Sequence, residues 1–147
     1  MKSAMMVPAV LLIVGLSAAT AQDSNRIDDR ILSAFKNEFS FAQNVKWSRE
    51  NENTRVSFTL NDQRLLAWYN PEGEQLSVAR NILYMQLPLA VVKAFEQNYG
   101  DASTAAITEV TRSNETVYYI QSERKGKKYL LRASPSGHIS VIKKIKG

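Results

Sequence analysis

The feature that most constrains this fold is a change of apolar period that occurs twice along the chain. In the first half, Ile27, Ile31, Phe35 and Phe39 recur every four residues, which is the spacing of one face of an α-helix. From Val45 onward, apolar and polar residues alternate, as they do in strands that bury one face. The first half therefore predicts a helix followed by antiparallel strands.

The second half shows the same order of signals. Pro88 suits the first turn of a helix, and Gly100 suits its end. Alternating stretches occur at 45–48, 55–60, 66–68 and 76–78, and again at 107–111, 116–121, 129–133 and 139–142. Turn-forming residues separate them at 50–53, 61–62, 70–73, 113–115, 123–127 and 134–137. The apolar connector at 80–88 is expected to be an extended segment that packs along the sheet.

Matching positions in the two halves lie 60 to 64 residues apart, as in Ala34-Phe35 with Ala94-Phe95 and Pro71-Glu72-Gly73 with Pro135-Ser136-Gly137. We therefore expect an α+β fold of two tandem repeats, at about 25–80 and about 86–147. Each repeat would be a helix plus a four-stranded antiparallel sheet. Because one helix covers only part of such a sheet, we expect the two units to pack together around a common interior.

The first 21 residues have the pattern of a secretory signal peptide. Lys2 supplies the positive start, residues 4–16 are uncharged and largely apolar, and Ala19 and Ala21 form an A-x-A cleavage site. The apolar run is shorter than the roughly 20 residues that span a bilayer, and an uncleaved anchor is the alternative interpretation. We expect cleavage near Ala21/Gln22, a mature chain of residues 22–147 without a membrane span, and a periplasmic or extracellular location.

An exported chain without cysteine cannot be stabilised by disulfides, so its stability must come from packing. The prominent aromatic side chains are the expected source of buried area. They are Phe35, Phe39, Phe41, Trp47, Phe58, Trp68, Phe95 and Tyr99.

Charge is divided unevenly along the mature chain. Residues 22–123 hold ten Lys or Arg and fourteen Asp or Glu, whereas residues 124–147 hold eight basic residues and no acidic one. The basic candidates for partner binding are Arg124, Lys125, Lys127, Lys128, Lys143 and Lys144. Two interpretations stay open: lysines that protect a sheet edge from aggregation, or a docking site for an acidic partner or an anionic surface polymer. Nucleic acid is not an expected partner, because an exported protein rarely meets it.

Three segments resemble the PepSY-like family of small exported bacterial proteins, whose fold is similar to that of the β-lactamase-inhibitor protein. They are FSFAQNVKW at 39–47, AWYNPEG at 67–73, and Arg80 ahead of Leu87-Pro88. These segments match the family's F-x-x-A-x-x-V-x-W stretch, its x-Y-x-x-x-G hairpin and the L-P that opens its second helix. Nearly all of 27–145 is covered. The chain departs from the family at Phe41, where members often carry Pro, and at Tyr99-Gly100, where they often carry Tyr-Pro.

The resemblance implies that residues 22–147 form one β-lactamase-inhibitor-like domain, acting as a periplasmic or surface-exposed interaction or regulatory module. The motifs concern packing and turns, so no binding residue is transferred from the family.

The residue types needed for catalysis are scarce. His138 is the only histidine and cysteine is absent, which removes nucleophilic triads unless His138 serves in one. Zinc sites need several His or Cys ligands, so we expect neither metal nor cofactor. The pairs Asp28-Asp29 and Glu72/Glu74 lie at a helix start and around a turn glycine, where acidic residues have structural roles. We therefore expect that the protein is not an enzyme.

The function expected from the sequence is a non-catalytic, exported binding or regulatory module of the cell envelope that acts on an unknown protein or peptide. The aromatic candidates for contact are Trp47, Trp68, Tyr69, Tyr84 and Tyr118, excluding any that face the core. The alternatives are a small-ligand carrier with a pocket lined by acidic residues or His between helix and sheet, and a structural protein tethered by its basic C-terminus.

Overall fold

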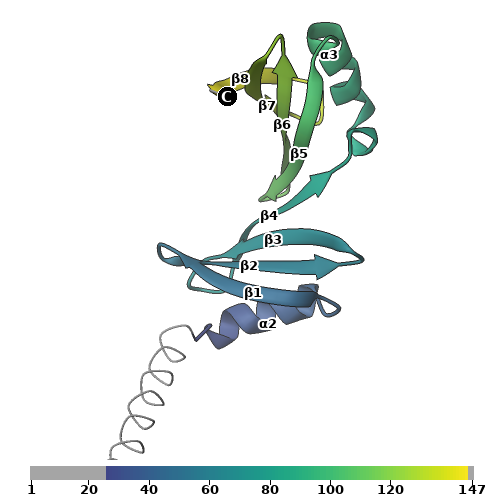
Figure 1. The fold of residues 1–147 in the computed structure, drawn as a ribbon. Helices are drawn as coiled ribbons and strands as arrows, with labels where there is room; N and C mark the ends of the chain where they lie inside the picture. Colours follow the sequence, from purple (N-terminus) through teal and green to yellow (C-terminus); the bar gives the residue numbers. More distant parts are fainter. Residues whose placement is uncertain (1–25, 146–147) are drawn as a thin grey trace, which may run out of the picture.

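The computed structural model describes residues 26–145, so the predicted signal peptide and its cleavage site lie outside the described residues. This part of the chain is mostly β (Figure 1). The first half contains α2 (Asp29–Glu38), β1 (Gln43–Glu50), β2 (Asn53–Leu60), β3 (Gln63–Tyr69) and β4 (Gln75–Ile82). The second half contains the 3₁₀ helix η2 (Tyr84–Gln86), α3 (Leu89–Tyr99), β5 (Ser103–Arg112), β6 (Glu115–Arg124), β7 (Lys127–Ala133) and β8 (Ile139–Ile145). None of the described helices is long and apolar enough to cross a membrane.

All eight strands belong to one antiparallel sheet in the order β1 to β8. The halves join through β4 and β5, whose residues pair from Val78 with Thr111 to Ile82 with Ile107. The expectation of two tandem repeats with separate four-stranded sheets packed around a common interior is therefore wrong. Strand β4 uses its second edge to pair with β5, so the sheet continues from one half into the other.

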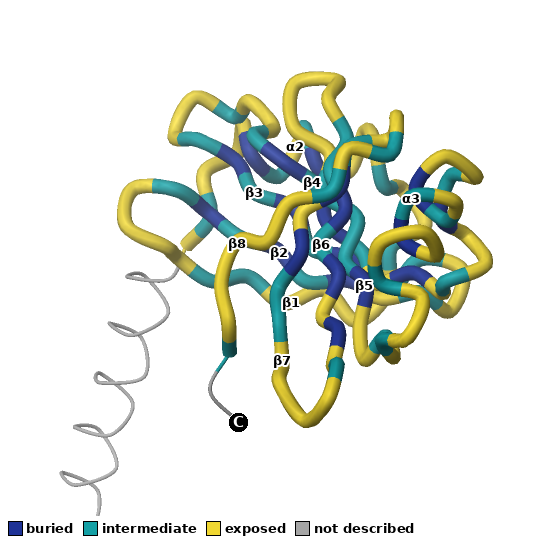
Figure 2. The backbone as a smooth tube through the Cα atoms, turned by 90° about the horizontal axis from the view of Figure 1, so that it is seen from above, coloured by how far each residue is buried: buried dark blue, intermediate teal, exposed yellow. Residues whose placement is uncertain are grey.

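Two apolar cores, one under each helix, replace the expected common interior. The first cluster is Ile31, Phe35, Val56, Phe58, Leu65, Ala67 and Tyr69. The second is Ile82, Leu87, Val91, Phe95, Ile107, Tyr118, Ile120, Leu131 and Ala133. Figure 2 shows the buried stretches along the sheet and on the inner turns of both helices, with exposed loops around them.

A polar group separates the two cores on the helix side of the sheet. Arg80 on β4 pairs with Glu109 on β5, with Arg80 Nε 2.7 Å from Glu109 Oε1. Arg80 is flanked in the sheet by Leu65 of the first core, and Glu109 by Tyr118 of the second. The hydrogen bond to Glu109 raises the pKa of Arg80. A charged pair at this position explains why the apolar surface is divided into two clusters.

Helix α2 begins at Asp29, at the Asp28-Asp29 pair that the sequence places at a helix start. Asp28 is its N-cap, and its Oδ1 accepts a hydrogen bond from the Arg30 backbone N–H at 2.8 Å. Ile31 and Phe35 are buried as their four-residue spacing predicts. Phe41, expected to contribute buried area, is instead 84% exposed, because it lies in the turn between α2 and β1.

The connector between the halves is partly helical. It was expected to be extended, but η2 occupies Tyr84–Gln86, with the Leu83 backbone N–H donating to Gln86 Oε1 at 2.8 Å. Leu87 is buried in the second core, and Pro88 is the N-cap of α3. The connector therefore fastens α3 to the sheet through Leu87.

Tyr84 connects this segment to α3 by donating a 2.6 Å hydrogen bond to Glu96 Oε1. Burial and the Glu96 carboxylate raise the pKa of Tyr84 from 10.0 to about 12. As the pH rises, the unfolded chain loses this proton first, so the stability linked to Tyr84 is complete below about pH 10 and is lost as the pH rises through about 12. We expect Tyr84→Phe to lose less stability than the wild type over this interval.

Denaturant unfolding of both proteins across the interval measures this difference, and the background titration of lysines is common to both. Equal losses for the wild type and Tyr84→Phe would contradict the raised pKa.

Short hairpins join β2 to β3, β5 to β6 and β6 to β7. In each, both turn residues have positive φ: Asn61 and Asp62, Ser113 and Asn114, and Lys125 and Gly126. Two-residue turns of this kind match the right-handed twist of the strands and fix their register. The predicted turns at these positions are confirmed.

Two longer turns carry glycines that touch the helices. Gly73 has φ +87° and follows Asn70, whose Oδ1 accepts from the Glu72 and Glu74 backbone N–H groups. Gly137 has φ +95°, and a Cβ placed there would lie 2.6 Å from the carbonyl oxygen of Ala90 in α3. A Cβ at Gly73 would lie 3.1 Å from the carbonyl oxygen of Arg30 in α2. Each turn therefore closes against the first turn of its helix, where positive φ and a close approach favour glycine.

Candidate binding surface

One face of the sheet carries no helix, and we call it the helix-free face. Both helices pack on the opposite face through the two cores. Cross-strand pairs run along the helix-free face from Arg55 to Trp68 to Ser77, and from Ala79 to Val110. These residues alternate with the core residues on their strands, so they face away from α2 and α3.

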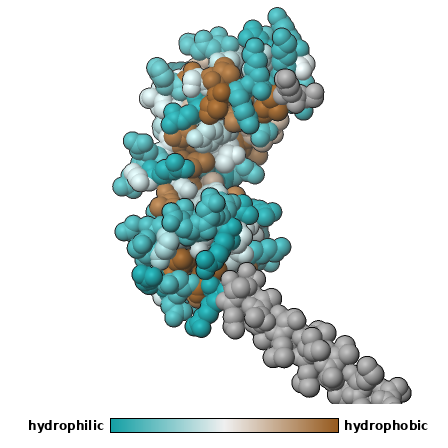
Figure 3. All heavy atoms as spheres, turned by 90° about the vertical axis from the view of Figure 1, so that its left-hand side faces the viewer, coloured by the Kyte–Doolittle hydropathy of each residue, from teal (hydrophilic) through white to brown (hydrophobic). Residues whose placement is uncertain are grey.

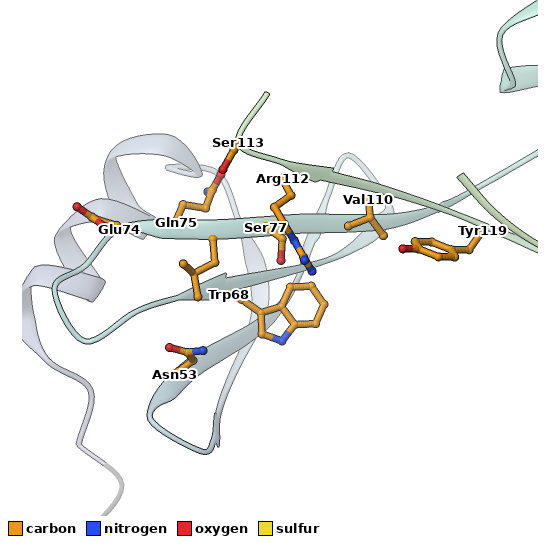
Figure 4. Close-up of a pocket in the computed structure, with 10 residues that line it drawn as sticks. Asn53, Trp68, Glu74, Gln75, Ser77, Val110, Arg112, Ser113 and Tyr119 are labelled. Carbon is orange, nitrogen blue, oxygen red and sulfur yellow. The ribbon is translucent and has the colours of Figure 1, made fainter. Parts of the chain in front are cut away.

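A hollow of about 650 Å³ lies across the middle of the helix-free face, between the two halves (Figure 4). Five successive strands, β2 to β6, contribute to it. Its lining residues are Asn53, Trp68, Glu74, Gln75, Leu76, Ser77, Val110, Arg112, Ser113 and Tyr119. In Figure 4 the side chain of Arg112 points toward Trp68 from β5, and Tyr119 lies beyond Val110.

Trp68 is held in place by a polar network on its own half. The indole Nε1 donates a 2.9 Å hydrogen bond to Glu50 Oε2, and Arg55 Nη1 lies 2.9 Å from Glu50 Oε1. Arg55 Nε also donates to Ser48 Oγ at 3.2 Å. The network satisfies the indole N–H and holds the partly exposed ring in place. A half-buried tryptophan held this way is a suitable anchor for a partner.

The helix-free face carries cations without an acidic partner, and one of them, Arg112, lines the hollow together with Glu74, whose carboxylate accepts from Asn70 Nδ2. In residues 26–145, the four ion pairs do not include Arg64, Arg112 or Lys46. Arg64 donates a 3.3 Å hydrogen bond to Ser57 Oγ, and together with Lys46 it lines a separate small depression on the same face. Glu50 is already engaged by Arg55 and Trp68. The helix-free face therefore favours an acidic partner.

The aromatic candidates separate according to face. Tyr69 is 0% exposed and Tyr118 is 6% exposed, and each lies inside a core. Neither can therefore contact a partner. Trp47 is half-buried and packs its ring against Phe35, with centroids 5.2 Å apart. Tyr84 is half-buried and bonded to Glu96. Trp68 is the predicted aromatic candidate that lines the hollow.

Sequence reasoning missed Tyr119, Val110 and Arg112, and it assigned the wrong phase to β3. The core residues of β3 are Leu65, Ala67 and Tyr69, not Leu66 and Trp68. The run LLAWY is apolar at every position, so alternation cannot decide which side faces the helix. Apolar residues on both faces of β3 could have indicated that the helix-free face also binds something, because a face that only contacts solvent is usually polar.

The basic candidates meet at the other end of the sheet. Lys125, Lys127 and Lys128 form the exposed β6–β7 hairpin, while Arg124 pairs with Asp101 at 2.9 Å. In the β7–β8 register, Tyr129 lies opposite Lys144 and Leu130 opposite Lys143. This pairing brings the basic hairpin and the C-terminal lysines together at one edge of the sheet. Because β8 is an edge strand, its lysines suit protection against aggregation.

Residues considered for chemistry have structural positions. The His138 backbone N–H donates to Ser134 Oγ within the last turn, and the His138 side chain is exposed. Asp28 caps α2, and Glu74 bonds Asn70 Nδ2 at 2.9 Å. Among the described residues, no three His, Cys, Asp or Glu side chains are grouped to hold a metal ion. A second hollow, of about 470 Å³ between α2 and β1, has no Glu, Asp or His in its lining.

Known proteins resemble this chain in structure. No protein-family model and no curated protein sequence matches it. A crystal structure of a DUF2874 family protein from Bacteroides uniformis is 18% identical with a TM-score of 0.71, covering 82% of this chain and 89% of that one. A protein with a proposed periplasmic location from Bacteroides eggerthii is 21% identical with a TM-score of 0.71, covering 82% and 88%.

A BLIP-like protein from Bacteroides fragilis is 20% identical with a TM-score of 0.73, covering 86% of this chain and 93% of its own. At these identities the comparison concerns the fold alone. The fold implied by the sequence resemblance, that of the β-lactamase-inhibitor protein, is confirmed, and the chain has a BLIP-like fold.

Proposed function

We propose that this protein is an exported, non-catalytic binding module of the cell envelope whose helix-free face docks an acidic protein or peptide. The observation that carries the proposal is the hollow across β2 to β6, where Arg112 points toward Trp68 and Tyr119 adds a second aromatic ring beyond Val110. Tryptophan, tyrosine and arginine are the residues most often responsible for binding energy at protein interfaces. Their presence on the sheet face without helices supports docking there.

Export is part of the proposal and rests on the N-terminal sequence pattern, with cleavage near Ala21/Gln22. The proposed periplasmic location of the Bacteroides eggerthii protein supports the same compartment for this chain. We also propose membership of the PepSY-like family, supported by the 39–47 and 67–73 segments. The absence of a catalytic role rests on the scarcity of His and Cys in the sequence.

Selection from a phage-displayed library of random peptides tests the docking face. We expect the selected peptides to be rich in Asp or Glu with a large apolar residue, because the hollow combines Arg112 with the rings of Trp68 and Tyr119. Arg112→Glu is expected to weaken their binding at least about tenfold. Titration in a Trp47→Phe background, where Trp68 is the remaining fluorophore, measures the affinity.

Lys93→Glu is the matched control, since it makes the same charge change on exposed α3, on the other side of the sheet. Its affinity should stay within about twofold of wild type, as surface changes away from a contact do. Peptides that respond equally to both variants, or that leave Trp68 fluorescence unchanged, would show that this face is not the docking site.

A further inference from the structure

Strand β1 offers a free backbone edge that is independent of the helix-free face. It lies at one end of the sheet order, so no described strand pairs with its outer side. Its irregularity is confined to the start, between Gln43 and Lys46, where Asn44 has φ +53°. From Lys46 to Glu50 the register with β2 is continuous. This straight stretch is long enough to pair with about five residues of another chain.

An apolar groove runs beside this edge. The hollow of about 470 Å³ between α2 and β1 is lined by Leu32, Phe35, Lys36, Phe39, Ser40, Ala42, Val45 and Trp47. Val45 is 37% exposed, so apolar surface reaches the outer side of the strand. Figure 3 shows that apolar atoms come to the surface in several places among hydrophilic ones. A strand added along β1 would point alternate side chains into this groove.

The charges around the edge select the partner. Lys36 lines the groove, and Lys46 projects from the other face of β1; neither belongs to the ion pairs of residues 26–145. Arg49 shares a small depression with Asp28 and Asp29, so Lys36 and Lys46 are the cations left at this edge. The one carboxylate of β1, on Glu50, is held by Arg55 and Trp68. Glu38, on α2, bonds Gln75 of β4 at 2.6 Å and so is directed away from β1. The edge is cationic and complements an acidic strand.

The opposite edge of the sheet, β8, differs in ways that disfavour its pairing with β1 of a second copy. Strand β8 is interrupted in its middle, at Leu130/Leu131 of its partner, and it carries Lys143 and Lys144. Pairing β8 of a second copy with β1 would bring those lysines toward Lys36 and Lys46, and this repulsion disfavours the contact.

From the free edge, the groove and the charges, we infer that β1 accepts an extended acidic segment of a partner protein as a ninth strand, with apolar side chains of that segment seated between α2 and β1. Main-chain hydrogen bonds to Lys46–Glu50 would supply affinity, and the groove with its cations would supply specificity. This site is on the other side of the first half from the hollow at Trp68.

A designed peptide tests the inference on the protein recovered from cells that express the full chain. The probe is an acetylated, amidated hexapeptide in which leucine or valine alternates with glutamate. Binding is followed by Trp47 fluorescence in a Trp68→Phe background and by amide hydrogen exchange of Lys46–Glu50. We expect saturable binding, slower exchange in that stretch, and at least tenfold weaker binding to Val45→Glu. Val141→Glu, on the β8 edge, is the matched control and should bind as the parent does.

Three further results decide the question. The same peptide with alternate amides N-methylated should lose binding, because methylation removes the donors that a new strand needs. Unchanged binding of the methylated peptide would overturn the inference. So would a Trp47 signal that stays constant in the Trp68→Phe protein while Trp68 responds to the same peptide in the Trp47→Phe protein. If the free protein dimerises and Val45→Glu abolishes the dimer, the β1 edge binds a second copy of this chain. That result would also overturn the inference. A negative result here leaves the Arg112 test unaffected, since each site has its own tryptophan.

Discussion

Replacing Phe35 with alanine is expected to lower the free energy of unfolding by about 4 kcal/mol. The ring is 4% exposed, and its centroid lies 5.6 Å from Phe39, 5.2 Å from Trp47 and 5.0 Å from Phe58. Truncation removes contacts with three aromatic rings and leaves a cavity that β2 and α2 cannot both close. Urea unfolding followed by circular dichroism measures the loss.

Phe41→Ala is the control, because it is the same substitution at a side chain that is 84% exposed. We expect a change within about 0.5 kcal/mol. Similar losses at Phe35 and Phe41 would contradict the burial pattern described for α2 and β1.

The energetic independence of the two cores can be tested with milder substitutions. Phe35→Leu and Phe95→Leu lie in different clusters, with Arg80 and Glu109 between them. Their effects on the free energy of unfolding should add to within about 0.5 kcal/mol in the double variant. If both residues lay in one common core, their effects on the free energy of unfolding would not add. A deviation larger than about 0.5 kcal/mol would therefore contradict the two separate cores.

Gly137→Ala is expected to cost about 3 kcal/mol, combining an unfavourable φ with a steric clash. The residue has φ +95°, and an added Cβ would lie 2.6 Å from the Ala90 carbonyl oxygen, which belongs to the first turn of α3. The backbone oxygen cannot move without shifting the helix from the second core. Thermal or urea unfolding gives the value.

Gly126→Ala separates the two causes. Gly126 has φ +75° in the β6–β7 hairpin, and nothing lies within 4 Å of a Cβ placed there. Its substitution should cost about 1 kcal/mol, the conformational part alone. If both glycines gave the same loss, the contact between the last turn and α3 would have no energetic role.

The sequence alone determined the local elements, because their causes are local. The four-residue spacing of Ile31 and Phe35, the alternation along β2 and β6, and the turn residues Asn61 and Gly137 each specify backbone geometry within a few positions. The position of the basic hairpin beside the C-terminal lysines could also be predicted, because consecutive strands connected by a short turn usually pair with each other.

Only the tertiary structure decided how the halves combine and which surfaces remain free. The β4–β5 pairing and the Arg80–Glu109 pair between two cores depend on contacts between residues far apart in the chain. Trp68 and Tyr69 are adjacent and both aromatic, yet one lines the hollow and the other is fully buried. Alternation gives a strand two faces but does not say which face a distant helix covers, and that choice positions both proposed binding sites.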